Sequence, residues 1–266
     1  MSSQHRNRER LKWVLAGMGI LYSALVLAMS MAWYSGQMIE PFHFFNDLPE
    51  WKQLDKFAHF FWTFQVAAIS YRLLKWGGLN ASIKWGAIAG FVFVSSVEIP
   101  DGFSTGYGAS IFDLMANALG AIFFFLQMHF WKSLNVFAKF SFHPTLYAIQ
   151  RPSLLGDGFL QELLKDYNGQ TFWYTWSPTL KHWPRWLSLA IGFGAEGMIY
   201  GRDSQNELHQ SFPYRKFLLS LDFNFAVIHF QKPWMNTLFY PLHILKCPAP
   251  ALEITEKGVR FHWLYF

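Results

Sequence analysis

An apolar run without charges near the N-terminus is the feature that most constrains this chain. Residues 13–34, WVLAGMGILYSALVLAMSMAWY, contain no charged side chain. A helix needs about 20 apolar residues to cross the hydrocarbon core of a bilayer, and this run is long enough. A signal peptide would have a shorter apolar core followed by a cleavage site. We therefore predict an uncleaved membrane helix over about residues 12–35.

Three further apolar stretches follow, over about residues 54–75, 82–99 and 109–132. Each of them borders on polar residues, so we expect the three helices to pack against one another rather than face lipid on all sides. Together with the first helix they predict a four-helix transmembrane domain in residues 1–134.

Basic and acidic residues are distributed asymmetrically about these helices. One set of helix ends carries most of the Lys and Arg: Arg6, Arg8, Arg10, Lys12, Arg72, Lys75, Lys84, Lys132 and Lys139. The opposite loops carry mainly acids: Glu40, Asp47, Glu50, Asp55, Glu98 and Asp101. Cytoplasmic loops of membrane proteins are enriched in Lys and Arg. Both termini are therefore predicted to be cytoplasmic. The acidic loops are predicted to face outward, toward the periplasm if the cell is a Gram-negative bacterium.

The pattern of polar and apolar residues changes at about residue 135. No apolar run in residues 135–266 is long enough to span a membrane, and several segments alternate polar and apolar residues as half-buried strands do. The sequence LEITEKGVRFHWLYF is typical of a hairpin that turns at Lys257-Gly258. The many tryptophans indicate a position close to the membrane surface. The predicted fold is thus an all-α membrane bundle followed by a smaller, membrane-proximal α+β domain.

Charge and cysteine content exclude several classes of function. The net charge of +5 is too small and too scattered to indicate a nucleic-acid-binding protein. Cys247 is the only cysteine, so an internal disulfide is impossible and a cysteine-based zinc or iron–sulfur site is not expected. With no cysteine near the N-terminus, we also expect no bacterial lipoprotein anchor.

Polar residues gather at the outward ends of the last three predicted helices. Asp55 and His59 are four residues apart and therefore share a helix face, with Lys56 beside them. Glu98 and Asp101 lie where the next helix ends. Because consecutive helices cross in opposite directions, we expect these groups to lie at one membrane depth.

The fourth helix opens with SIFDLMANALG and contributes to the same level. Asp113 and Asn117 share a helix face, and Gly120 follows on that face. Ser110 precedes the helix and is suited to cap it. Gly120 has a structural explanation, because a glycine lets two helix backbones approach closely.

Two kinds of explanation fit these polar groups. They could simply join three helices through hydrogen bonds, but such bonds stabilise membrane helices by only about 0.6 kcal/mol on average. Ionisable residues clustered at a membrane helix end are more typical of a functional site. The number of polar groups therefore favours a function.

Three functional hypotheses remain open from the residues alone. The site could hold a lipid head group or glycolipid, or a metal bound by His59, Glu98, Asp101 and Asp113. It could also belong to a hydrolase or transferase with His59 or Glu98 as general base. No nucleophile elbow, HExxH helix or phosphate-binding loop is present. Because acids outnumber bases, the composition favours a divalent cation or a neutral, hydroxyl-rich ligand over a bare phosphate. To bind at this site, a phosphate would need its charge offset by Lys56, a protonated His59 or a bound cation.

Short motifs in this region resemble those of a known family. They are DKxxHF at Asp55–Phe60, an acid near an outer helix end at Glu98, and SxxDxxxNxxG at Ser110–Gly120. Their order and placement resemble the VanZ-like superfamily, and most closely its YfiM-like branch of bacterial envelope proteins. The tail stretch Lys165–Thr171 and the strings GFGAEGM, SLDFN and PAPALEI also resemble longer members of that branch.

The resemblance implies a multi-pass protein of the bacterial inner membrane without implying a particular activity. VanZ itself is associated with resistance to teicoplanin. The motif residues carried over are Asp55, Lys56, His59, Glu98, Asp113, Asn117 and Gly120. VanZ-like proteins commonly have an Arg shortly before the last motif helix, whereas this chain has GFSTGYGAS there. A bidentate phosphate anchor at that place is therefore not expected.

The sequence leads to one hypothesis of function and two alternatives. The first is an envelope membrane protein, in contact with membrane lipids, whose outward-facing pocket binds a lipid or glycan precursor or a cation. The alternatives are a membrane-embedded, metal-assisted hydrolase or transferase acting on such a lipid, and an assembly factor that docks a protein partner through its tail. The expected pocket residues are Asp55, Lys56, His59, Glu98, Asp101, Ser110, Asp113, Asn117 and Gly120.

Overall fold

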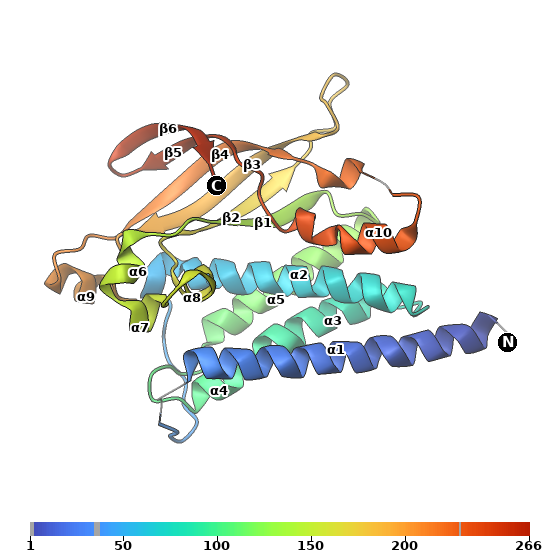
Figure 1. Ribbon diagram of the computed structural model, residues 1–266, viewed down its shortest axis with the longest axis horizontal. Helices are drawn as coiled ribbons and strands as arrows, with labels where there is room; N and C mark the ends of the chain where they lie inside the picture. Colours follow the sequence, from blue (N-terminus) through green and yellow to red (C-terminus); the bar gives the residue numbers. More distant parts are fainter. Residues whose placement is uncertain (1–2, 35–37, 229) are drawn as a thin grey trace. The chain divides into compact units, whose positions relative to one another are not determined.

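The chain forms two compact units, each described here by itself. The computed structural model describes residues 3–34, 38–228 and 230–266. The first unit comprises Met1–Leu48 and His59–Leu134, and the second comprises Pro49–Ala58 and Asn135–Phe266. Figure 1 labels the helices and strands of both units.

The first unit is helical, as the sequence predicts. Its helices are α1 (Ser3–Trp33), α2 (Leu54–Trp76, which belongs to this unit from His59 onward), α3 (Ser82–Ser95), α4 (Glu98–Gly102) and α5 (Ile111–Phe130). Residue 35, the predicted end of the first helix, lies outside the described residues. The predicted third helix is divided, because α3 ends at Ser95 and the chain resumes as α4. The Ser96 hydroxyl donates to the carbonyl of Phe93 at 2.7 Å, a bond that bends or ends helices.

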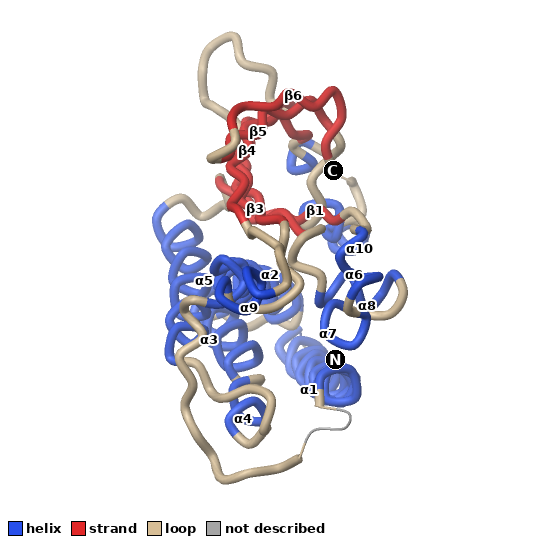
Figure 2. The backbone as a smooth tube through the Cα atoms, turned by 90° about the vertical axis from the view of Figure 1, so that its left-hand side faces the viewer, coloured by secondary structure: helices blue, strands red, loops and turns tan. Residues whose placement is uncertain are grey.

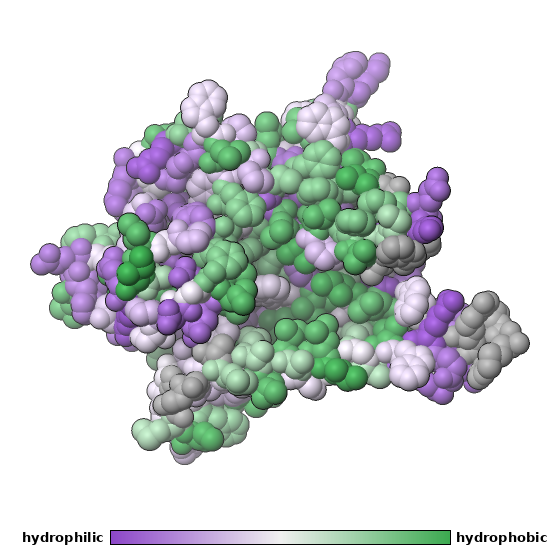
Figure 3. All heavy atoms as spheres, in the orientation of Figure 1, coloured by the Kyte–Doolittle hydropathy of each residue, from purple (hydrophilic) through white to green (hydrophobic). Residues whose placement is uncertain are grey.

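Four membrane spans are not confirmed. Among the described residues, three helical stretches are long and apolar enough to cross a membrane: Asn7–Met31, Ser82–Gly102 and Ile111–Phe130. Hydrophobic side chains cover the middle of α1 in Figure 3, and hydrophilic ones gather toward its N-terminal end. Helix α2 is long enough to cross but is not among the three. It carries charged residues at both ends, such as Asp55 and Lys75, and polar residues between them.

Helix α2 is instead largely shielded from the surface. Phe61, Phe64 and Ala67 on this helix are almost completely buried. Glycines of the neighbouring helices bring their backbones against it. A Cβ atom at Gly90 of α3 would lie 2.7 Å from the Thr63 carbonyl oxygen, and one at Gly120 of α5 would collide with the Phe60 carbonyl oxygen. Close approach of α3 and α5 to α2 therefore requires glycine at both positions.

The second unit contains a six-stranded antiparallel sheet, which fits the predicted α+β tail. Its strands are β1 (Val136–Phe142), β2 (Gln170–Trp176), β3 (Leu187–Glu196), β4 (Tyr214–Phe223), β5 (Ala249–Thr255) and β6 (Gly258–Tyr265). They pair in sequence order, and the sheet curls strongly (Figure 2). Short helices occupy the connections: α6 (Leu146–Gln150), α7 (Pro152–Leu155), α8 (Phe159–Lys165), α9 (Asp203–Leu208) and α10 (Pro233–Leu238). The β5–β6 hairpin turns immediately before Gly258, whose φ of +122° suits glycine.

The concave side of the sheet holds a small core with buried charges. The buried residues that cluster there are Trp173, Ala190, Leu218, Ala251 and Tyr265. Trp173 on β2 and Tyr265 on β6 contact each other across this side, with ring centroids 5.9 Å apart. The side chains of Lys139 and Asp222 form an ion pair at 2.6 Å, with 2% and 0% of their surface exposed. This side of the sheet is therefore mixed in polarity rather than apolar.

The segment Pro49–Ala58 belongs to the second unit and contacts the connection between β3 and β4. The Trp51 amide donates to the carbonyl of Gly201 at 2.7 Å, and Lys52 pairs with Asp203 at 2.6 Å. Trp51 and Lys52 adopt left-handed φ angles of 50° and 52°, which are uncommon for non-glycine residues. These long-range contacts stabilise that turn, and sequence patterns do not reveal them.

The close approach at Gly120 makes a stability prediction. We expect Gly120→Ala to lower the free energy of unfolding by about 1–3 kcal/mol, because the added methyl group overpacks the α2–α5 contact. Gly17→Ala on α1 is the matched control, since a Cβ there meets no atom within 4 Å. The control should be neutral or slightly stabilising, because alanine favours helix. Unfolding by SDS titration in detergent micelles measures both, and equal effects would contradict this packing.

Candidate functional site

Asn117 connects three helices of the first unit through its buried side chain. Its Oδ1 accepts a hydrogen bond from the Thr63 hydroxyl of α2 at 2.9 Å, and its Nδ2 donates to the Ser95 hydroxyl of α3 at 3.2 Å. The same Oδ1 lies 3.2 Å from Nδ1 of His59. An amide oxygen can only accept, so His59 carries a proton on Nδ1. Asn117 thereby orients the imidazole ring.

The other nitrogen of His59 faces two carboxylates. Nε2 lies 3.6 Å from Oδ2 of Asp113 and 3.9 Å from Oε1 of Glu98. Ligand atoms from these three residues all lie within 4.8 Å of one another. Four ligands placed tetrahedrally at about 2.1 Å from a metal would be about 3.4 Å apart. The three side chains, the His59–Glu98–Asp113 cluster, are therefore spaced to hold one metal ion after a small contraction.

The burial of Glu98 imposes the strongest electrostatic requirement on the cluster. The residue is only 4% exposed. Its Oε2 accepts a hydrogen bond from the Ser110 amide at 2.7 Å, whereas its Oε1 accepts none from any described residue. A buried carboxylate oxygen without a hydrogen bond is costly, because burial removes its hydration. A cation between Glu98 and His59 would remove that cost.

Ser110 fixes the start of α5 beside the cluster. Its hydroxyl accepts a hydrogen bond from the Asp113 amide at 3.1 Å, which makes it the N-cap of the helix. The same hydroxyl donates to Oδ1 of Asp47 at 2.6 Å. The N-terminal end of a helix favours negative charge, so the position of Asp113 in the first turn is favourable.

Asp101, the fourth ligand predicted from the sequence, is engaged elsewhere. Its Oδ1 accepts a hydrogen bond from the Tyr34 hydroxyl at 2.6 Å. Burial and the nearby Asp101 raise the pKa of Tyr34, so its hydroxyl keeps the proton that it donates. Asp101 does not belong to the His59–Glu98–Asp113 cluster, and it serves below as a control.

Asp55 and Lys56 lie in the segment Pro49–Ala58, which is part of the second unit. Nζ of Lys56 and Oδ2 of Asp55 pair at 2.7 Å. The charges of these neighbours therefore offset each other. Gly120 lies one turn beyond Asn117 and acts through packing, as described above.

Two loops pair beside the end of α4 and the start of α5. Ile39 forms an antiparallel bridge with Ser104, and Phe44 forms a parallel bridge with Ala109. Nε2 of His43 donates to the Tyr107 carbonyl at 2.8 Å, since a carbonyl oxygen only accepts. These bonds tie the segment that contains Asp47 to the connection that leads into α5.

Several residues of the site were not predicted from the sequence. Thr63 follows His59 by four residues on the same helix face, so helical spacing could have found it. Ser95 and Asp47 reach Asn117 and Ser110 through tertiary contacts at separations of 22 and 63 residues. No local pattern marks such contacts.

Comparisons with known proteins support an envelope protein but not the resemblance drawn from the motifs. The sequence model of a family described as "predicted periplasmic lipoprotein (DUF2279)" matches residues 44–129. The match covers less than half of the chain but includes His59, Glu98, Asp113 and Asn117. The assignment to the VanZ-like superfamily and its YfiM-like branch is therefore wrong, because the matching family is a different one. No curated protein and no solved structure matches the chain.

The matched family indicates association with the cell envelope and names no specific activity. Its description mentions a lipoprotein, but the one cysteine of the chain, Cys247, lies outside the matched residues. The match therefore supports an envelope location without supplying a lipid attachment site.

The central position of Asn117 can be tested through stability. We expect Asn117→Leu to lower the free energy of unfolding by about 3 kcal/mol, because it leaves buried partners on α2 and α3 without hydrogen bonds. Leu119→Ala, at an exposed position of the same helix, should change it by less than about 0.5 kcal/mol in detergent. SDS titration compares the two variants, and a neutral Asn117→Leu would refute the role of Asn117 as the junction.

Proposed function

We propose that this chain is an envelope membrane protein that binds one divalent cation in its helical unit. The ligands are Nε2 of His59, a carboxylate oxygen of Glu98 and a carboxylate oxygen of Asp113. The observation that carries the proposal is Oε1 of Glu98, a buried oxygen that accepts no hydrogen bond from described residues and lies 3.9 Å from Nε2 of His59.

The orientation of His59 supports a metal ligand. Metal-binding histidines usually donate their second ring N–H to an oxygen, which fixes the ring and the tautomer. Asn117 accepts that proton from Nδ1, so Nε2 presents a lone pair toward the two carboxylates. A neutral imidazole facing two anions gains little by itself, whereas a cation between them attracts all three groups.

The chemistry of the donors narrows the choice of ion. One imidazole nitrogen and two carboxylates suit Zn²⁺, Mn²⁺ or Fe²⁺. Ca²⁺ and Mg²⁺ prefer sites made of oxygen atoms alone. We therefore propose a transition-metal ion. A bound cation would also let the site accept a phosphate-bearing lipid or glycan precursor, which the surplus of acids otherwise disfavours.

A metal-assisted hydrolase or transferase is the second candidate function. The described residues provide three ligand atoms, the number typical of catalytic zinc sites that keep a position open for water or substrate. A metal supplies Lewis acidity and lowers the pKa of a bound water. In that case His59 and Glu98 would be ligands rather than the general base, and an envelope lipid would be the substrate class.

We also propose that α2 crosses the inner membrane as a fourth span. Its lower hydropathy has a physical explanation, since α3 and α5 pack closely against it and shield it from lipid. A shielded helix does not need to be apolar on every face. Four crossings would leave both termini in the cytoplasm, as the distribution of Lys and Arg suggests.

The number of spans predicts the side of the C-terminus. A reporter enzyme fused after Phe266 should be active as a cytoplasmic reporter if α2 crosses the membrane, and as a periplasmic one if only three helices cross. A second fusion within the loop at Gly77 to Leu79 fixes the side of the α2–α3 turn. A periplasmic C-terminus would overturn the four-span topology.

Metal binding predicts a thermal shift that depends on the cluster. At a free metal concentration about 100 times the Kd, the wild-type protein should gain about 2.7 kcal/mol of stability. His59→Ala and Glu98→Gln should lose this gain. Glu98→Gln should also stabilise the metal-free protein, because a neutral amide does not need the hydration that a buried carboxylate loses.

Asp101→Asn is the matched control for this experiment. It changes another carboxyl residue of α4, one that accepts a hydrogen bond from Tyr34 rather than facing His59. It should keep the metal-dependent gain measured by calorimetry in detergent. An unchanged metal-dependent gain in stability in His59→Ala would contradict both the cation proposal and the enzyme alternative. The absence of stoichiometric metal binding by the wild type would contradict both as well.

A further inference from the structure

One face of the sheet in the second unit is apolar and exposed over strands β4 to β6. Its large side chains are Phe217, Leu219, Leu221, Leu252, Ile254, Val259, Phe261, Trp263 and Leu264, each at least 37% exposed. We refer to these nine residues as the β4–β6 apolar face. Contiguous exposed patches of this kind mark interaction surfaces in folded proteins.

The buried charged residues of the same strands, Lys216, Asp222 and Glu253, lie on the opposite, enclosed face, whereas the exposed Arg215 precedes Phe217 at the edge of the apolar face. Besides the buried pair of Lys139 and Asp222, Glu253 pairs with His262 at 3.1 Å, with Glu253 only 7% exposed. A water-exposed sheet usually shows the reverse arrangement, with its apolar face inside. Apolar residues outside and polar residues inside are the arrangement found where strands face lipid.

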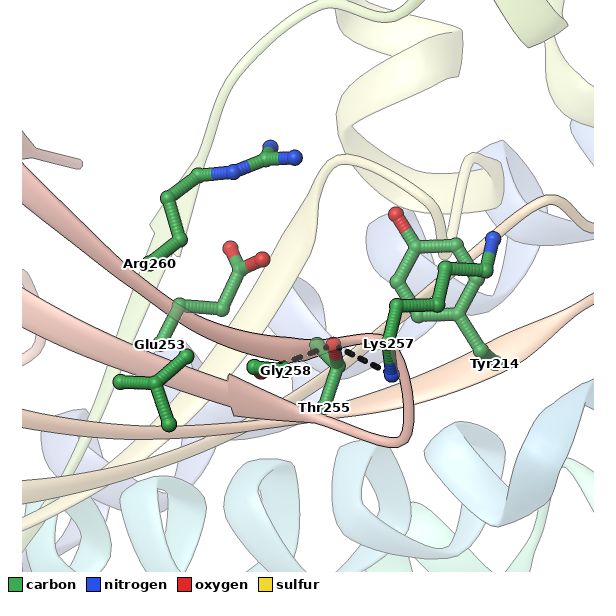
Figure 4. Close-up of a pocket in the computed structure, with 7 residues that line it drawn as sticks. Tyr214, Glu253, Thr255, Lys257, Gly258 and Arg260 are labelled. Carbon is green, nitrogen blue, oxygen red and sulfur yellow. Dashed lines mark hydrogen bonds between the residues drawn. The ribbon is translucent and has the colours of Figure 1, made fainter.

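The two ends of the β4–β6 apolar face differ in chemistry. Trp186 and Trp263 lie exposed toward the end where β3 begins and β6 ends. The hairpin at the other end carries the exposed Lys257, which lines a polar cavity of about 110 Å³ together with Glu253 and its strand partner Arg260 on the opposite face (Figure 4). Tryptophan favours the interface between lipid and water, and basic residues favour anionic head groups.

Among the described residues of the second unit, an aromatic contact covers the same sheet face at β3. Phe57 stacks on Phe193 of β3, with ring centroids 4.9 Å apart, and Phe193 contacts Phe217 of β4 edge to face. Beyond Phe217 the described side chains of the face are exposed. It is also convex, because Trp173 and Tyr265 meet on the concave side. A fluid hydrocarbon layer conforms to a convex surface, whereas a protein partner would need a matching hollow.

We infer that the β4–β6 apolar face rests on a lipid bilayer and is covered by hydrocarbon. The contact is interfacial, because β6 is the last strand of the sheet and an open strand edge is not tolerated within hydrocarbon. The chain enters β1 soon after α5, a candidate membrane span, so a bilayer that holds α5 is no more than about 20 Å of extended chain away.

The inference is tested with the full chain in lipid nanodiscs. Cys247→Ser removes the native thiol, and a single cysteine at Phe261 or Leu219 then carries an environment-sensitive fluorophore. Nanodiscs with brominated acyl chains are compared with unbrominated ones. Glu207→Cys, exposed on α9 and outside the β4–β6 apolar face, is the matched control.

Labels at Phe261 and Leu219 should lose emission with brominated chains, and the label at Glu207 should not. Using two positions keeps the test valid if one variant does not fold. Absence of quenching at both positions would overturn the inference. Energy transfer between labelled copies without quenching by bromine would assign the face to a second copy instead. Protection by an added protein partner without quenching would support a docking role of the tail and would likewise overturn the lipid contact.

Discussion

The buried carboxyl group of Glu98 is the constraint on which the helical unit depends. A carboxylate among membrane helices needs compensating groups, and the chain supplies the Ser110 amide on one oxygen and His59 near the other. Those partners come from different helices and must be held in place. Asn117 joins α2, α3 and α5, and Gly120 lets α5 approach α2 closely enough for the two sides to meet. The close packing of the helices therefore holds the groups that compensate Glu98 in place.

Much of the candidate site could be predicted because helical spacing and alternating helix direction are simple rules. Spacing placed Asp113 and Asn117 on one face, and topology brought them to the level of His59 and Glu98. The sequence grouped Asp101 with the metal ligands, whereas its carboxylate is oriented by a hydrogen bond from Tyr34, a residue distant in sequence. Asp47 could not be found, since a loop brings it to Ser110 and carries no periodic signal. The family was misassigned because short motifs carry little information.

The tail shows a related limit of sequence reasoning. The alternation of polar and apolar residues correctly indicated strands and the hairpin before Gly258. It does not tell which of the two faces of the sheet is enclosed and which is exposed. Only the structure shows which face is which. The sheet face that carries Lys139, Asp222 and Glu253 is enclosed, and the face that carries Phe261 is exposed. The exposed apolar face of the second unit and the candidate membrane spans of the first are each suited by composition to contact with lipid.

Magnetic resonance of bound Mn²⁺ tests the cation proposal most directly. Purified protein loaded with one Mn²⁺ should show hyperfine coupling to an imidazole nitrogen in pulsed electron paramagnetic resonance spectra. That coupling should vanish in His59→Ala and persist in Asp101→Asn. A Mn²⁺ signal without nitrogen coupling, or one that His59→Ala leaves unchanged, would contradict a metal centre built from His59, Glu98 and Asp113.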